Sequence, residues 1–274
     1  MEKITLSLVL ASSLMMAADV AVDQTKLATD ITAAKAEKSA AEEKLKALEA
    51  QLPQNQDIIT HMQLGYIKTD GNTKTETFSL DGSFKKAWGN NSGSIIFDGQ
   101  YGNADGAETK NKYFVELQYA YLFTDTLSFT YLVGYKNDKF SSYNYQAYTG
   151  PGMKWATYKS DRQKLDLEAS LLYSQDVLQS VIAPADDTNT YSSYQAKLAY
   201  ELNIFENLKF KQGLSYRSSF EDANNYFIFS NSSLSSKISD VFSAGMSYKI
   251  DYTNIAPGKE KQDNTLTAFI SLDY

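Results

Sequence analysis

The chain has 274 residues, enough for one large domain or two small ones, a net charge of −7 and no cysteine. The negative charge argues against a nucleic-acid partner, which needs clustered lysine and arginine, and the lack of cysteine excludes disulfides, thiolate metal sites and thiol nucleophiles. Its 20 Tyr and 14 Phe coexist with a mean hydropathy of −0.40, because polar residues are interspersed among the apolar ones. This composition is typical of a transmembrane β-barrel, whose strands alternate lipid-facing and lumen-facing side chains.

Residues 1–18 are predicted to be a secretory signal peptide that is removed after export. Lys3 is followed by an apolar run from Ile4 to Met16 and then by two small residues, Ala17 and Ala18. A short buried helix is the alternative interpretation of this run. The run is too short to span a bilayer as a helix, and no later stretch reaches the ~20 apolar residues that a spanning helix needs. A membrane crossing by this chain is therefore expected to use strands.

Residues 19–56 are predicted to form a periplasmic helical segment. The stretch 22–52 is rich in Ala, Lys, Glu and Leu and contains neither Gly nor Pro until Pro53. Positions spaced alternately by four and three residues form a heptad pattern: Leu27, Ile31, Ala34, Lys38, Ala41, Leu45, Leu48 and Leu52. Two interpretations stay open, a coiled coil through which the chain associates with itself and a single solvated helix that lies against another surface.

Residues 57–274 are predicted to be an all-β, antiparallel transmembrane barrel. In Thr126–Lys136, for example, Leu127 and Phe129 lie on one face and Ser128 and Thr130 on the other. Twelve strands are expected, at 58–69, 73–88, 93–102, 111–124, 126–137, 142–157, 163–175, 190–202, 207–219, 225–237, 241–252 and 264–274. The serine-rich tenth strand is the least regular, so ten strands are the alternative count.

The connections between the predicted strands alternate in length. Those after strands two, four, eight and ten are short, and those after strands three, seven, nine and eleven are longer and polar. Aromatic residues lie near the strand ends, as in the interfacial girdles of membrane barrels. This pattern predicts an outer-membrane barrel with both termini in the periplasm, although the tight first connection, Asp70-Gly71-Asn72, is an exception. A soluble periplasmic barrel that binds a small ligand is a competing hypothesis.

The C-terminus carries an alternating apolar pattern that ends on an aromatic carboxylate, formed by Leu266, Ala268, Ile270, Leu272 and Tyr274. It resembles the signal by which the barrel-assembly machinery recognises outer-membrane proteins. The expected partners are accordingly this machinery and outer-membrane lipid, with self-association through residues 22–52 as a further hypothesis.

Residues 62–175 carry the turn and strand motifs of a known family. They include Leu64-Gly65-Tyr66 with Thr69–Thr73, then Tyr135–Ser141, Gly150-Pro151-Gly152, and Asp161-Arg162 before Lys164–Ala169. In these motifs the chain resembles the salt-induced outer membrane protein family of Gram-negative bacteria. The resemblance implies an outer-membrane β-barrel domain of unknown function with no catalytic set to carry over, and the N-terminal helix is an addition to the family pattern.

Three features that could bind a ligand have simpler interpretations. Gly71-Asn72 and Gly150-Pro151-Gly152 are interpreted as turn and kink residues, because Gly and Asn tolerate positive φ. His61, the only histidine, lies on the polar side of the first strand beside Gln63 and cannot alone make a two-histidine metal site. We therefore predict no enzyme activity, no cofactor and no metal.

The charges on the inward face of the strands are the candidate functional residues. If the predicted register holds, the lumen is lined by Asp81, Lys85, Asp98, Glu116, Lys154, Asp166, Glu168, Lys197, Glu201, Lys209, Lys211, Arg217, Lys249, Asp251 and Asp273. Lys209, Lys211 and Arg217 form the densest basic run. One hypothesis is a narrow passive channel for ions or small hydrophilic solutes, with opposed charges around a constriction. The other is a structural barrel, plugged by paired charges, that anchors a periplasmic helix which binds peptidoglycan or a protein partner.

Overall fold

The computed structural model describes residues 58–69, 74–179 and 188–274, together with Thr32 and Lys35, which are helical. The predicted signal peptide, and the predicted helix apart from these two residues, lie outside the described residues. The chain divides into two units, residues 1–54 and 55–274, and the second contains all the described strands. Within the described part of the chain, no helix is both long and apolar enough to cross a membrane.

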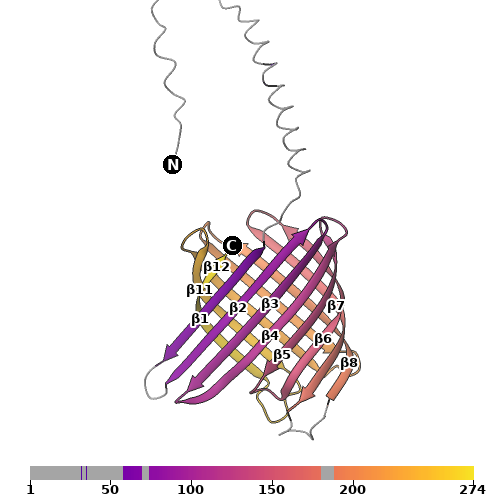
Figure 1. Cartoon of the computed structure of the whole chain (residues 1–274), viewed down its shortest axis with the longest axis vertical. Helices are drawn as coiled ribbons and strands as arrows, with labels where there is room; N and C mark the ends of the chain where they lie inside the picture. Colours follow the sequence, from indigo (N-terminus) through magenta and orange to yellow (C-terminus); the bar gives the residue numbers. More distant parts are fainter. Residues whose placement is uncertain (1–31, 33–34, 36–57, 70–73, 180–187) are drawn as a thin grey trace, which may run out of the picture. The chain divides into compact units, whose positions relative to one another are not determined.

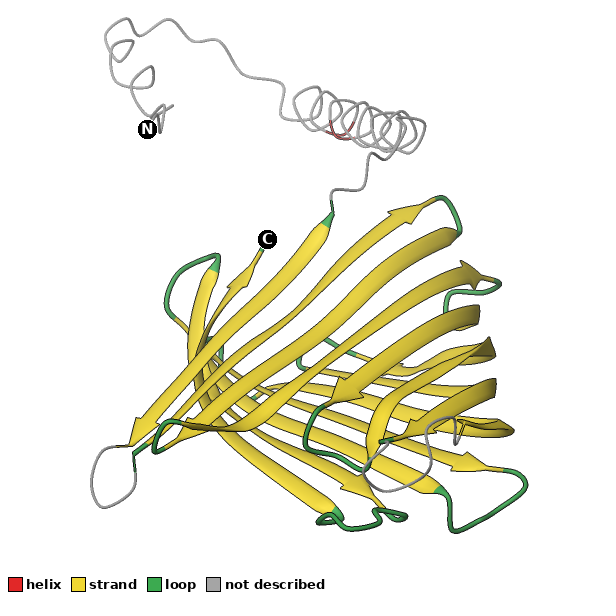
Figure 2. Ribbon diagram, turned by 60° about the horizontal axis from the view of Figure 1, so that its bottom comes forward, coloured by secondary structure: helices red, strands yellow, loops and turns green. Residues whose placement is uncertain are grey.

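Twelve antiparallel strands form one closed barrel in which β1 pairs with β12 (Figures 1 and 2). They are β1 (Ile59–Thr69), β2 (Thr75–Trp88), β3 (Asn91–Ala104), β4 (Ala107–Leu122), β5 (Leu127–Asp138), β6 (Tyr143–Lys159), β7 (Gln163–Leu178), β8 (Thr188–Asn203), β9 (Leu208–Ser219), β10 (Tyr226–Lys237), β11 (Phe242–Thr253) and β12 (Gln262–Asp273). The predicted twelve-stranded barrel is confirmed. The ten-strand alternative is wrong, because the serine-rich β10 pairs along its length with both β9 and β11.

The two ends of the barrel differ in their connections. We call the end that holds Tyr274 the terminal end, and the opposite end the loop end. The terminal end carries the turns 89–90, 123–126, 160–162, 204–207 and 238–241. The loop end carries the connections 105–106, 139–142, 220–225 and 254–261, and β1 and β7 end there. The predicted tight connection at residues 70–72 lies outside the described residues.

The connection after β3 is shorter than predicted. It consists of Asp105 and Gly106 alone, with φ values of 49° and 84°. Positive φ at both central residues is the geometry of a two-residue type I′ hairpin, for which Asp-Gly is a preferred sequence. The prediction of a long polar loop here was wrong because both strands continue through polar residues, so that β4 begins at Ala107 rather than at residue 111.

The side chains alternate between the outside and the inside of the barrel along the strands, apart from register shifts in the β3–β4 and β6–β7 pairs. Outward residues of β7 such as Leu171 and Tyr173 are 62% and 59% exposed, whereas inward polar residues such as Thr130 and Ser174 are fully buried. A soluble barrel would place its apolar residues inside, so this inverted distribution is the one expected of a lipid-exposed barrel with a polar interior.

Outward aromatic rings form a row near the loop end. Tyr135 stacks between Tyr113 and Tyr145, with ring centroids 6.0 and 5.6 Å apart, and Tyr226 stacks on Tyr252 at 5.8 Å. Tyrosine rings prefer the boundary between hydrocarbon and water, because the ring is apolar and the hydroxyl is polar. The row therefore marks one edge of the apolar band.

The Gly150-Pro151-Gly152 segment lies inside β6 and not at a turn. A Cβ atom added to Gly150 would lie 2.1 Å from the carbonyl oxygen of Leu171 and 3.0 Å from the Cα atom of Leu172. The described glycines with positive φ are Gly89, Gly106 and Gly258, so the predicted need for positive φ at this segment was wrong. Gly150 is required because two backbones approach closely there.

We expect Gly150→Ala to destabilise the barrel by about 1–3 kcal/mol, because the new methyl group meets backbone atoms that cannot rotate away. The change in unfolding free energy is measured by urea unfolding in lipid vesicles. The folded fraction at each urea concentration is read from the gel mobility of unheated samples. Gly99→Ala is the matched control, since the nearest atom to its added Cβ is 3.8 Å away. Equal stability of the two variants would contradict the packing role of Gly150.

Candidate functional site

The interior of the barrel holds the charges that the sequence singled out. The strand register places on the inward set of positions Asp81, Lys85, Asp98, Glu116, Lys154, Asp166, Glu168, Lys197, Glu201, Lys209, Lys211, Arg217, Lys249, Asp251 and Asp273. They differ in what they contact: most belong to two groups of paired charges, some form separate pairs, and four have no ion pair with any described residue.

The first group, here called the cross-barrel lattice, consists of Asp81, Asp98, Lys112, Lys249, Asp251 and Asp263. Lys249 of β11 forms ion pairs with both Asp81 of β2 and Asp98 of β3, which are directly opposite each other in the register. Lys112 of β4 is nearly buried and binds Asp251 at 2.7 Å and Asp263 at 2.9 Å. These contacts join β2–β4 to β11 and β12 through the interior.

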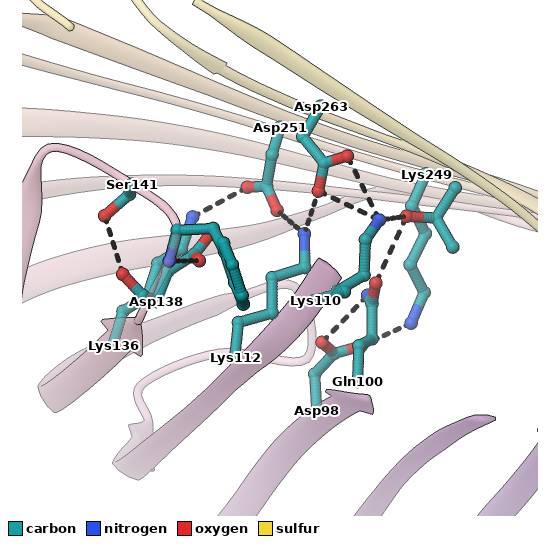
Figure 3. A network of polar contacts seen from close by, with 12 residues as sticks. Asp98, Gln100, Lys110, Lys112, Lys136, Asp138, Ser141, Lys249, Asp251 and Asp263 are labelled. Carbon is teal, nitrogen blue, oxygen red and sulfur yellow. Dashed lines mark hydrogen bonds and ion pairs between the residues drawn. The ribbon is translucent and has the colours of Figure 1, made fainter. Parts of the chain in front are cut away.

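Figure 3 shows how the lattice extends toward the loop end. Lys136 of β5 binds Asp251 at 2.8 Å, and Lys110 of β4 binds Asp263 at 3.0 Å. Lys110 also donates to the hydroxyl of Thr265 at 2.6 Å. Carboxylates and ammonium groups therefore alternate across the loop-end half of the lumen, so that most charges there have a partner of opposite sign.

The second group, here called the Glu116 cluster, lies on the other side of the interior. Glu116 of β4 is buried, accepts a hydrogen bond of 2.9 Å from the Tyr148 hydroxyl, and pairs with Lys197 of β8 at 2.6 Å. Glu168 of β7 accepts two hydrogen bonds from the amide of Gln118, at 2.9 and 3.0 Å. This cluster connects β4 with β7 and β8.

Arg217 of β9 is held between two aromatic rings. Its guanidinium carbon is 4.6 Å from the ring centroid of Tyr148 and 4.7 Å from that of Phe227, and Nη2 is 3.8 Å from Asp176. Asp176 also accepts a hydrogen bond of 2.5 Å from Tyr191. Cation–π contacts of this kind fix the side chain, so Arg217 is a structural part of the inner wall.

A small apolar core narrows the lumen next to Arg217. Leu132, Tyr148 and Leu172 are buried together, with Phe114 packed against them. These residues come from β4, β5, β6 and β7, and they fill one side of the interior. The open space is consequently displaced toward β9–β12.

Three cavities follow one another along the lumen. The terminal-end cavity has a volume of about 880 Å³, the central cavity about 340 Å³ and the loop-end cavity about 380 Å³. The central cavity shares Gly213 and Phe229 with the terminal-end cavity, and it shares Lys136 and Asp251 with the loop-end cavity. Neighbouring cavities therefore adjoin each other, at Gly213 and Phe229 on one side and at the Lys136–Asp251 ion pair on the other.

The β11–β12 connection, residues 254–261, crosses part of the loop end. The hydroxyl of Ser142 donates to the carbonyl of Pro257, and that of Tyr143 donates to the carbonyl of Ile255, both at 3.0 Å. The connection thus reaches from β11 to the start of β6 on the other side of the barrel and narrows this opening.

Some predicted candidates are not joined to either group. Lys154 binds Asp166 at 3.1 Å, with Lys164 as a second partner of Asp166 at 3.2 Å. His61 hydrogen-bonds Asp273 at 2.7 Å. Four candidates have no ion pair with any described residue: Lys85, Glu201, Lys209 and Lys211. Within the described ranges, no three His, Cys, Asp or Glu side chains are placed to hold a metal ion.

Four central residues were missed in the sequence analysis: Lys112, Lys136, Asp176 and Asp263. Asp176 and Asp263 were assigned to loops, but β7 extends to Leu178 and β12 begins at Gln262. Lys112 and Lys136 lay in predicted strands on the inward positions, so the two-residue period already contained the signal that would have found them.

Comparisons with solved structures give barrels of low sequence identity. A structure described as the NanC porin is 13% identical over 78% of this chain and 98% of its own, with a TM-score of 0.47. A structure described as the KdgM porin in complex with disordered oligogalacturonate is 10% identical over 78% and 99%, with a TM-score of 0.43. An outer membrane channel from Pseudomonas putida F1 is 9% identical over 79% and 95%, with a TM-score of 0.46. Because these similarities are weak, the functional proposal below depends on this barrel's own residues.

No curated protein matches the sequence. A family profile described as "Protein of unknown function, DUF481" matches residues 62–274, which is nearly the whole barrel. The chain therefore belongs to the DUF481 family.

Proposed function

We propose that this protein is a narrow passive channel for ions or small hydrophilic solutes in the bacterial outer membrane. The observation that carries the proposal is the succession of three cavities along a lumen that charged side chains line, in which neighbouring cavities share lining residues. Side chains can move aside for a small solute without any change in the barrel backbone. The proposal includes no catalytic step.

The charged interior favours a hydrated lumen over a structural core. Burying ion pairs costs desolvation free energy, and apolar packing of the same volume is often as stabilising or more so. Ionisable residues inside a membrane protein commonly face water or a transport path. Lys249 with Asp81 and Asp98, and Lys112 with Asp251, are therefore better explained as the walls of a polar path.

The outer surface supports the membrane location. Apolar residues such as Leu64, Leu117 and Ile270 face outward and are about half exposed, and aromatic rings line the loop-end edge of the apolar band. Exposed apolar surface of this extent would be unfavourable in water and is favourable in lipid. Export by residues 1–18, and assembly through the alternating residues that end at Tyr274, are parts of this proposal.

A plugged structural barrel is the second candidate function, and the cross-barrel lattice is the observation that favours it. If the paired charges never separate, the barrel is an anchor, and the predicted helix within residues 22–52 binds peptidoglycan, a protein partner or its own copies. The resemblance to salt-induced outer membrane proteins stays a prediction compatible with either function.

We expect the purified, refolded protein to give discrete conductance steps in a planar bilayer. The steps should be smaller than those of 16-stranded porins, because twelve strands enclose a narrower lumen that charged side chains fill in part. Removal of residues 22–52 should leave the steps unchanged. Silence from protein shown to be inserted would favour the plugged anchor.

We expect Lys249→Met to destabilise the barrel by about 3–5 kcal/mol, because Asp81 and Asp98 lose the cation that lies between them. The same variant should conduct more and prefer cations, since two uncompensated carboxylates then line a wider passage. Urea unfolding and the reversal potential in a salt gradient measure the two effects.

The control is the triple variant Lys249→Met, Asp81→Asn, Asp98→Asn, which removes both signs of charge together. It should recover most of the stability and lose the preference for cations. A Lys249→Met protein with unchanged conductance and selectivity would show that the lattice does not border the permeation path.

A further inference from the structure

Two lysines in the terminal-end cavity differ from the other inward cations of the barrel. Lys209 and Lys211 of β9 both line this cavity, and neither has an ion pair with any described residue. By contrast, Lys112, Lys136 and Lys249 are each bound to carboxylates in the cross-barrel lattice. A cation without a protein partner in a polar cavity is available to a negatively charged solute.

The other charges around the cavity form no direct ion pair with these lysines, although the Asp273 carboxylate lies close enough to interact with both electrostatically. The charged lining residues are His61, Asp161, Arg162, Glu206, Lys209, Lys211, Lys237, Asp240 and Asp273. His61 is bound to Asp273 and Lys237 to Asp240, at 2.7 and 3.0 Å. Asp161, Arg162 and Glu206 lie on the turns at the rim. The remaining nearby carboxylate is Glu201 of β8, which is opposite Lys211 in the register.

The wall beside the lysines is neutral and rich in hydrogen-bonding groups. Lys209 and Lys211 lie opposite Ser235 and Ser233 of β10 in the register. Asn231, also on β10, has a buried side-chain oxygen without a hydrogen-bond partner in the described protein. A solute hydroxyl group could donate to this oxygen, and an unsatisfied buried acceptor costs free energy until it is satisfied.

We propose that the terminal-end cavity binds small organic anions that carry hydroxyl groups, and that Lys209 and Lys211 select their negative charge. Its volume of about 880 Å³ falls within the range of small-molecule sites. Gly213 and Phe229 line both this cavity and the central cavity, so a bound anion lies next to the junction between the two. The selectivity part of this inference rests on the proposed channel function.

The test uses gluconate as the hydroxylated anion and sorbitol as its neutral counterpart. Calorimetric titration of the folded full chain in detergent at low salt should show binding of gluconate and none of sorbitol. The variant Lys209→Gln, Lys211→Gln should bind gluconate about 25-fold more weakly, because each of the two charges, at about 4 Å from a carboxylate in water, contributes about fivefold. Glu201→Gln should strengthen binding.

Lys86→Gln is the matched control, because Lys86 lies on β2 at the same end of the barrel but on the outward set of positions. It should bind gluconate as the original chain does. In planar bilayers, the original chain and this control should prefer anions, and the double variant should lose that preference.

The outcomes separate the site from the channel. Equal gluconate binding by the original chain and the double variant, with both shown to be folded, overturns the site even if the protein conducts. Binding that depends on Lys209 and Lys211 in a barrel that never conducts keeps the site and rejects the channel.

Discussion

The closure of the barrel by the β1–β12 pair is the constraint on which the rest of the structure depends. A backbone N–H or C=O group that meets hydrocarbon without a partner costs several kcal/mol, so a sheet in lipid must have no free edge. Gln63 opposite Ser271 and Leu64 opposite Ile270 complete the ring of strands. Once the sheet is closed, successive side chains must face lipid and lumen in turn. A chain rich in tyrosine and in charged residues meets this requirement, because tyrosines can face the lipid and charges the lumen.

Closure also explains why the interior charges meet across long distances in sequence. Lys249 binds Asp81, 168 residues away, because only β12 and β1 separate β11 from β2 in the closed ring. The charges at the loop-end half are mostly paired, whereas Lys209 and Lys211 at the terminal-end half are not. The lumen is thus asymmetric along its axis, with a neutralised half and a half that has cationic groups available to solutes.

Most of the fold could be predicted from the two-residue alternation of apolar and polar side chains, because this alternation is a local property of each strand. It predicts inward positions for Lys249 and Asp81, and the Asp105-Gly106 dipeptide is a second local signal, typical of a tight hairpin turn. What local patterns could not give is which inward residues meet, because that depends on strand tilt and register around the whole barrel. Arg217 shows the difference: its sequence neighbours suggested one basic run with Lys209 and Lys211, but two aromatic rings fix it in the wall.

The central claim is that water and small solutes reach the middle of the barrel from both ends. The chain has no cysteine, so a single cysteine in place of Ser215, which lines the central cavity, would be its only thiol. The decisive measurement is its reaction with a small charged thiol reagent that cannot cross lipid, added to either side of oriented vesicles. We predict reaction from both sides, and none for a cysteine in place of the outward Leu214. Reaction of the Ser215→Cys thiol from one side only, or from neither, would contradict a continuous path and show that the lattice or Phe229 closes the barrel.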